Sequence, residues 1–213
     1  ARRVPGAFRR TRCGRPRPEH GTRRQGEPLM THAMPAIRTL SAEGLTLEPQ
    51  CAGHAQAMFD VLDDPAVYTY LDDAPPASAT LLRERFHRLE SRRSADGREL
   101  WLNWAVRLDT GELAGFVQTT VSEGGFAWIA FVIGRAFWGQ GVAQRAARAV
   151  LSEGSAHYGI TQWLATADPR NQRSIRLLAR LGFTAAPPAL RSEHDVAESD
   201  VLLRLTPRLH DSA

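Results

Sequence analysis

The 213-residue chain contains no lysine, only two cysteines and no long apolar run. The missing lysine excludes a P-loop, whose motif requires Gly-Lys-Ser/Thr. Cys13 and Cys51 give no case for a disulfide framework, and a reducing, cytoplasmic setting is expected. No apolar segment approaches the ~20 residues of a membrane span. The seven histidines lack the paired spacing of a zinc site, so no metal is expected. His54, His87 and His157 are expected on helix surfaces.

Positive charge is concentrated at the start of the chain. Residues 1–33 carry nine arginines and two acids, whereas residues 34–213 carry 18 arginines and 21 acids. Residues 1–33 are rich in proline and glycine and have little apolar surface to bury, so we expect a disordered tail. This tail has three interpretations: an RNA-binding arm, an organelle presequence or translated upstream sequence. The third is considered because Met30 and Met34 precede the first core-like segment. Residues 34–213 are long enough for one domain.

Residues 131–143 run from an apolar strand through a Gly-x-Gly turn into an alanine-rich helix. Gly139 and Gly141 have no Cβ, so backbone amides there can approach a ligand closely. The first turn of a helix also leaves N–H donors without intrahelical partners, and no Ser, Thr, Asp or Asn is placed here to cap them. Arg145 and Arg148 add positive charge, which favours a bound anion unless both side chains point into solvent. The pattern predicts an anion-binding loop.

A second motif occupies residues 168–183 and is typical of a strand end followed by a short amphipathic helix that stops at Gly182. Asn171 and Ser174 are three residues apart, so they share one face of the first turn. In the ordinary interpretation Asn171 is the N-cap and Ser174 is a normal helix-start residue.

The two motifs together resemble those of the GCN5-related N-acetyltransferase (GNAT) superfamily. The resemblance rests on Phe137-Trp138-Gly139-Gln140-Gly141-Val142-Ala143, then Asp168-Pro169-Arg170-Asn171-Gln172-Arg173-Ser174-Ile175-Arg176 and Leu181-Gly182-Phe183. Within the superfamily, the chain is most similar to the branch that contains the ribosomal-protein N-terminal acetyltransferases. The resemblance covers residues 42–205. It implies an α+β fold with a mixed, mostly antiparallel central sheet, flanked by helices and splayed at the cofactor site.

The resemblance also implies that acetyl-CoA is the co-substrate. Backbone amides from Trp138 to Gln144 would hold its pyrophosphate, the strand residues would pair with its pantetheine arm as an added β-strand does, and Asn171 would hydrogen-bond that arm from the other side. The implied cofactor-binding residues are Phe131, Val132, Ile133, Trp138, Gly139, Gln140, Gly141, Val142, Ala143, Gln144 and Asn171.

Catalytic roles follow less directly from the resemblance. Ser174 would lie near the thioester sulfur and donate a proton to the departing thiolate, because Leu178 occupies the place where many members have a tyrosine. Trp128 stands where many members of the branch have a glutamate that serves as the base. The remaining candidate bases are Glu123, Asp72 and Asp73, although each also fits a solvated loop acid.

The predicted reaction is direct acetyl transfer to a primary amine, because no cysteine or serine nucleophile motif is present. The acceptor is a protein α-amine or a small amine, and the acidic domain weakly favours a cationic one. The predicted acceptor-binding residues are Tyr70, Asp72, Asp73 and Trp128. Tyr68, Tyr70 and Trp104 could line an acceptor pocket, although aromatic residues at such spacing more often belong to a core. The alternatives are a catalytically silent acyl-CoA-binding module and, if the tail is native, an RNA-binding protein. The chain is expected as a monomer or homodimer.

Hydrophobic periodicity and turn residues predict the elements of this domain. The expected strands are 45–48, 101–108, 112–121, 126–133, 161–167 and 200–205, and the expected helices are 52–62, 79–92, 140–157 and a short one within 168–181.

Overall fold

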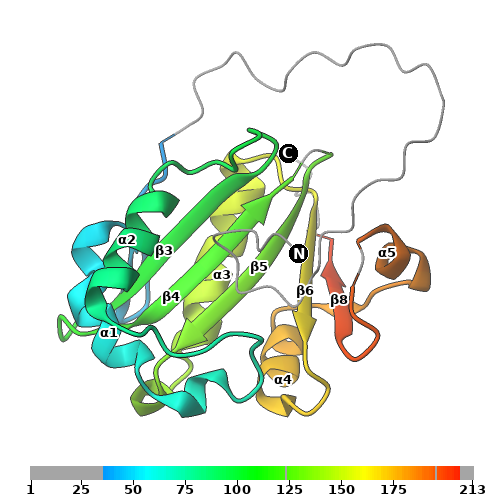
Figure 1. Cartoon of the computed structure of the whole chain (residues 1–213). Coiled ribbons are helices and arrows are strands. Elements are labelled where there is room, and N and C mark those ends of the chain that lie inside the picture. The colour runs from blue at the N-terminus through cyan, green and yellow to red at the C-terminus, as the bar shows by residue number, and fades with distance from the viewer. Residues whose placement is uncertain (1–35, 123, 195, 207–213) are drawn as a thin grey trace.

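The computed structural model describes residues 36–122, 124–194 and 196–206, and these form one central sheet flanked by helices (Figure 1). The tail predicted at residues 1–33 and the candidate base Glu123 lie outside the described residues. The strands are β1 (Leu40–Ala42), β2 (Leu45–Pro49), β3 (Leu100–Leu108), β4 (Leu113–Val121), β5 (Phe126–Ile133), β6 (Gln162–Ala167), β7 (Thr184–Ala185) and β8 (Val201–Leu205). The helices are α1 (Ala55–Leu62), α2 (Ala79–Leu89), α3 (Val142–His157), α4 (Gln172–Arg180) and α5 (Pro188–Glu193), with 3-10 turns at Ala52–His54, Pro65–Tyr68 and Arg135–Phe137.

The sheet has the strand order β1-β2-β3-β4-β5-β6-β8-β7. Its first five strands form an antiparallel meander, and β6, β8 and β7 are also mutually antiparallel. Among the described strands, only the pair β5–β6 is parallel, because α3 carries the chain back across the sheet between them. The predicted α+β class with a mixed, mostly antiparallel sheet is confirmed.

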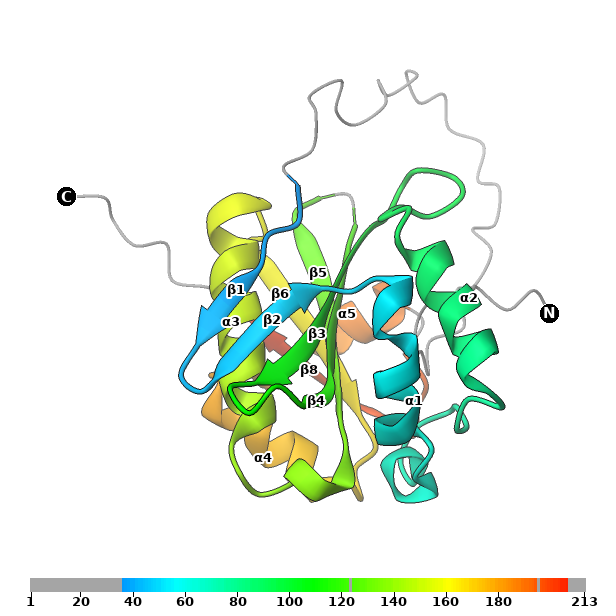
Figure 2. The ribbon, with the colours of Figure 1, turned by 90° about the vertical axis from the view of Figure 1, so that its left-hand side faces the viewer.

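Helices cover both faces of the sheet. The side chains of β5 point alternately toward the two helical layers and pack against both. Figure 2 shows α3 and α4 on one face and α1, α2 and α5 on the other. Ile129 and Ile133 belong to the core that includes Val150 of α3, whereas Val132 packs in the core that includes Met58 of α1. Successive side chains of a strand point to opposite faces, so β5 is held from both sides.

The predicted strands agree with the structure within one or two residues at each end, but three elements were missed: β1, β7 and α5. Three predicted helices are shorter than expected, and the one predicted at 140–157 begins at Val142, after the Gly-x-Gly turn. The segment 52–62 begins with a 3-10 turn before α1 starts at Ala55, and the segment 79–92 ends at Leu89 because Arg92 has a φ of 57°. Positive φ is incompatible with a right-handed helix.

The histidine prediction is correct at two positions and wrong at one. The side chains of His87 and His157 are 78% and 46% exposed. That of His54 is only 11% exposed, because the 3-10 turn at Ala52–His54 directs its ring toward Glu48 on β2. Among the described helices, none is long and apolar enough to cross a membrane.

Candidate active site

The sheet opens between its two parallel strands. β5 and β6 pair only from Phe126 to Trp128 and from Gln162 to Leu164. Beyond Trp128, β5 remains paired with β4 as far as Ile133, while the rest of β6 remains paired with β8. The two strands therefore diverge toward their C-terminal ends, and the splayed sheet predicted from the sequence is present.

The register of β4 and β5 shows which backbone groups face this gap. Ser122 N–H donates to the Phe126 carbonyl at 3.0 Å, and Gly134 N–H donates to the Ala114 carbonyl at 2.9 Å. These bonds direct the backbone groups of even-numbered β5 residues, including Val132, toward β4. Phe131 lies between them, so its backbone N–H and C=O point into the gap, beyond the last β6 partner.

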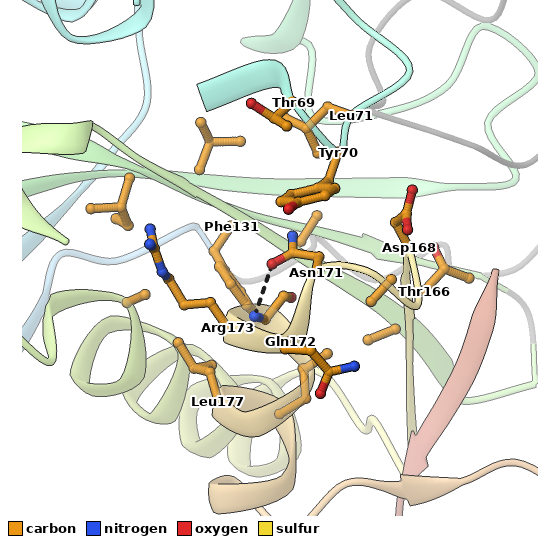
Figure 3. A pocket seen from close by; sticks show the side chains of 18 of the residues that line it. Thr69, Tyr70, Leu71, Phe131, Thr166, Asp168, Asn171, Gln172, Arg173 and Leu177 are labelled. Carbon is orange, nitrogen blue, oxygen red and sulfur yellow. Dashed lines mark hydrogen bonds between the residues drawn. The ribbon is translucent and has the colours of Figure 1, made fainter. Parts of the chain in front are cut away.

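A cavity of about 560 Å³ fills the gap, within the usual size range of small-molecule sites. One wall comes from β5 and the loop after α1, and the other from the end of β6 and the start of α4. Figure 3 shows Tyr70 from the first wall and Asn171 from the second lying opposite one another. Of the predicted residues, those that line the cavity are Tyr70, Asp72, Phe131, Val132, Ile133, Trp138, Ala143, Asn171 and Ser174.

The Gly-x-Gly turn leads from the end of β5 into α3. Gly139 has a φ of 78° and Gly141 a φ of 73°, and no side chain caps the helix start. Within the described part of the chain, the N–H groups from Gly139 to Gln144 have no hydrogen-bond partner. The N–H of Trp138, which was predicted to belong to this set, instead donates to the Arg135 carbonyl at 3.2 Å. A row of free N–H groups at the positive end of a helix is a suitable cradle for an anion.

Arginine side chains lie close to this turn. The guanidinium of Arg173, from the first turn of α4, stacks 4.1 Å above the ring of Trp138. The Trp138 indole N–H donates to the Ile133 carbonyl at 2.7 Å, which fixes the ring against the end of β5. Arg145 Nη1 donates to the Gln140 carbonyl at 3.2 Å, so Arg145 folds back onto the turn and does not extend into solvent. Arg173 was not among the predicted site residues, because only the fold brings α4 next to Trp138.

Asn171 caps α4, as the ordinary interpretation predicts. Its Oδ1 accepts a hydrogen bond from the backbone N–H of Ser174 at 3.1 Å (Figure 3). The cap uses the amide oxygen and leaves Nδ2 as a donor in the cavity wall. Ser174 contributes only its backbone to the cap, and within the described residues its hydroxyl has no hydrogen-bond partner. Both residues can therefore cap the helix and contact a ligand at once.

Three of the predicted acceptor-binding residues, Asp72, Asp73 and Trp128, lie in different surroundings. Asp72 is exposed at the cavity wall, whereas Asp73 lies outside the lining, where it pairs with Arg85 at 3.4 Å and accepts from the N–H of Ala74. Trp128 also lies outside the lining, and its ring makes an edge contact with His194 at 5.5 Å between centroids.

Two buried aspartates in the cavity wall were not predicted. Asp168 follows β6 and is 4% exposed, and its carboxylate binds Arg170 through Nε at 3.0 Å and Nη2 at 2.8 Å. This pairing raises the pKa of Arg170, whose guanidinium lies 6.0 Å from the centre of the Tyr70 ring. Asp200, just before β8, is also buried at the cavity. Asp168 and Asp200 come to the same cavity because β6 pairs with β8, and the sequence alone does not show that pairing.

Comparison with known proteins identifies the family. Residues 44–184 match the family described as acetyltransferase (GNAT) domain. The chain is 27% identical over 149 residues to a Bacillus licheniformis protein named uncharacterized N-acetyltransferase p20, a match that covers 69% of this chain and 83% of that one. The chain belongs to the GNAT family of acetyltransferases.

Solved structures share the fold. The ribosomal L7/L12 alpha-N-protein acetyltransferase RimL, determined in complex with coenzyme A, superposes with a TM-score of 0.65 and 20% identity, covering 79% of this chain and 98% of RimL. The Vibrio cholerae spermidine N-acetyltransferase, determined with CoA and spermine, gives a TM-score of 0.62 and 16% identity, covering 77% of this chain and 96% of that chain.

Proposed function

We propose that the protein transfers the acetyl group of acetyl-CoA directly to a primary amine. The observation that carries the proposal is the cavity between the splayed strands. Its lining includes Trp138 and Ala143, which flank the turn whose N–H groups have no partner among the described residues. Family membership supplies the class of reaction, and the solved relatives that contain CoA support the choice of co-substrate.

The residues around the cavity suit both the diphosphate and the pantetheine arm of acetyl-CoA. The amides from Gly139 to Gln144 would bind the diphosphate, with Arg173 beside them as a counter-charge. The backbone of Phe131 would pair with the amide groups of the pantetheine arm, as an added β-strand does. Asn171 Nδ2 would donate to the same arm from the opposite wall.

The co-substrate supplies an activated acetyl thioester. In the transfer, the C–N bond to the acceptor forms while the C–S bond breaks, so the chain must orient the amine and return a proton to the sulfur. Ser174 donates this proton from its hydroxyl, and Asp72 binds or deprotonates the incoming amine at the cavity wall. No residue of the chain needs to carry the acetyl group.

A protein N-terminal amine and a polyamine are the acceptor classes that the solved relatives suggest. Measuring thiol release from acetyl-CoA with peptides, polyamines and aminoglycosides tests the proposal. We expect turnover with at least one class. Acetyl-CoA binding without turnover on any of these amines would instead indicate a silent acyl-CoA-binding module, which Trp128 at the place of the usual acid makes a specific alternative.

Replacing Arg173 by alanine should raise the KM for acetyl-CoA up to about fivefold and leave kcat nearly unchanged, because an exposed ion pair contributes about 1 kcal/mol at most to binding. Steady-state kinetics at low and high salt measure the effect, which should shrink as salt screens the charge. Arg180→Ala removes the same charge from the exposed far end of α4, outside the cavity lining, and should change nothing. Equal effects of the two substitutions would contradict a local role for Arg173.

A further inference from the structure

A second cluster of chemically reactive side chains lies where β2 leads into α1 (Figure 2). Cys51 Sγ is 3.5 Å from His54 Nδ1, and His54 Nε2 is 2.9 Å from Glu48 Oε2. None of these three residues lines the cavity of the candidate active site. This cluster therefore combines a nucleophile, a base and a carboxylate that orients the base, and it lies apart from the candidate active site.

The hydrogen bonds of His54 assign its protons. The backbone N–H of Cys51 donates to His54 Nδ1 at 3.1 Å, so Nδ1 carries a lone pair. The proton of the neutral ring is consequently on Nε2, where it is donated to Glu48. The same nitrogen lies 3.5 Å from the Cys51 thiol, so it takes up the thiol proton when its lone pair turns from the backbone N–H to the thiol.

Glu48 is fixed as an anion by a neighbouring strand. Arg107 of β3 donates to both carboxylate oxygens, from Nε and from Nη2, at 2.8 Å each. These bonds lower the pKa of Glu48 to about 2. An ionised carboxylate at Nε2 stabilises the imidazolium that forms when Nδ1 takes up a proton.

Charged groups after α2 also face the thiol. Arg92 interacts electrostatically with Cys51, and its Nη2 donates to the Gln50 carbonyl at 2.8 Å. Arg92 Nη1 is buried without a hydrogen-bond partner among the described residues, so it is a spare donor beside the cluster. Glu90 opposes this charge from the same segment, with Oε1 accepting from the N–H of Ala52 at 2.6 Å.

We propose that Cys51 is a peroxide-reactive thiol, with His54 as its base and Glu48 as the residue that positions the base. His54 takes the thiol proton as the sulfur attacks one peroxide oxygen. The S–O bond forms, the O–O bond breaks, and His54 returns the proton to the departing hydroxide as water. The sulfur is oxidised by two electrons to a sulfenic acid, and the peroxide is reduced.

The surroundings of Cys51 favour a small electrophile of this kind. Its side chain is neither fully buried nor fully exposed, so a small neutral oxidant reaches it more readily than a bulky disulfide does. The proposal does not depend on acetyl transfer, because it concerns a different surface of the fold.

The test uses the full chain with Cys13→Ser, which leaves Cys51 as its single cysteine. Sulfenic acid formation by hydrogen peroxide is followed by dimedone trapping and mass spectrometry at neutral pH. We expect the folded chain to react at least about tenfold faster than the same chain in urea, and His54→Gln to remove most of that gain. His157→Gln is the matched control, since His157 is 46% exposed on α3 and pairs with Glu153, outside the cluster.

Two results would overturn the proposal. One is a folded chain that reacts no faster than the unfolded chain. The other is a folded His54→Gln variant that reacts as fast as its parent, which would reduce His54 to a residue that only stabilises the turn. If circular dichroism shows that the His54 variant does not fold, the comparison between the folded parent and the parent in urea decides alone.

Discussion

Replacing Gly139 and Gly141 together by valine is expected to lower kcat/KM for acetyl-CoA at least ~100-fold, a loss of about 3 kcal/mol. Both glycines have positive φ values, which a β-branched residue cannot adopt without strain. A Cβ at Gly139 would meet no atom within 4 Å, and one at Gly141 would lie 3.4 Å from Arg145 Nη1. The turn would distort, and its N–H groups would lose their common direction. Steady-state kinetics with varied acetyl-CoA measure the effect.

The control for this pair is Gly44→Val. Gly44 lies between β1 and β2, has a φ of 69° and also has open space where its Cβ would be. The Gly44→Val variant therefore shows the effect of backbone strain alone. We expect it to have a lower melting temperature, with kcat/KM unchanged in the folded fraction. If Gly44→Val impairs turnover as strongly as the double replacement does, the amides of the Gly-x-Gly turn have no special role.

The second large effect is expected at Ser174. Ser174→Ala should lower kcat about 100-fold, the order of magnitude of a lost general acid, with the KM for acetyl-CoA nearly constant. The cap of α4 survives this change, because Asn171 accepts from the backbone N–H of residue 174 and not from the hydroxyl. Pre-steady-state thiol release and a melting curve separate chemistry from folding.

Ser152→Ala makes the same substitution on the exposed face of α3 and should leave kcat unchanged. An unchanged kcat in Ser174→Ala would leave Ser174 as an ordinary helix-start residue, and another proton donor would have to be sought in the cavity wall.

The Gly-x-Gly turn and the cap of α4 were predictable from the sequence, because their signals are local. Gly139 and Gly141 are adjacent to the helix that they open, and Asn171 caps a helix within three residues of itself. Short-range patterns of this kind report backbone conformation directly. The meander 100–133 was predictable for the same reason, since alternating apolar residues and glycine turns lie next to one another in the chain.

The position of the acidic residues around the cavity was less predictable, because tertiary contacts decide which of them line it. Asp72 and Asp73 are neighbours in sequence, yet one lines the cavity and the other pairs with Arg85 on α2. Asp168 and Asp200 both reach the cavity through the pairing of β6 with β8. The missed elements β1, β7 and α5 are short and are held mainly by neighbouring strands and loops, so they have little periodicity of their own.

Calorimetric titration of the purified chain with acetyl-CoA tests the central assignment most directly. The account predicts saturable heat with one ligand bound per chain, and the loss of that heat when Gly139 and Gly141 are both valine. A folded native chain that gives no heat with acetyl-CoA, or a double variant that binds as tightly as the native chain, would contradict it.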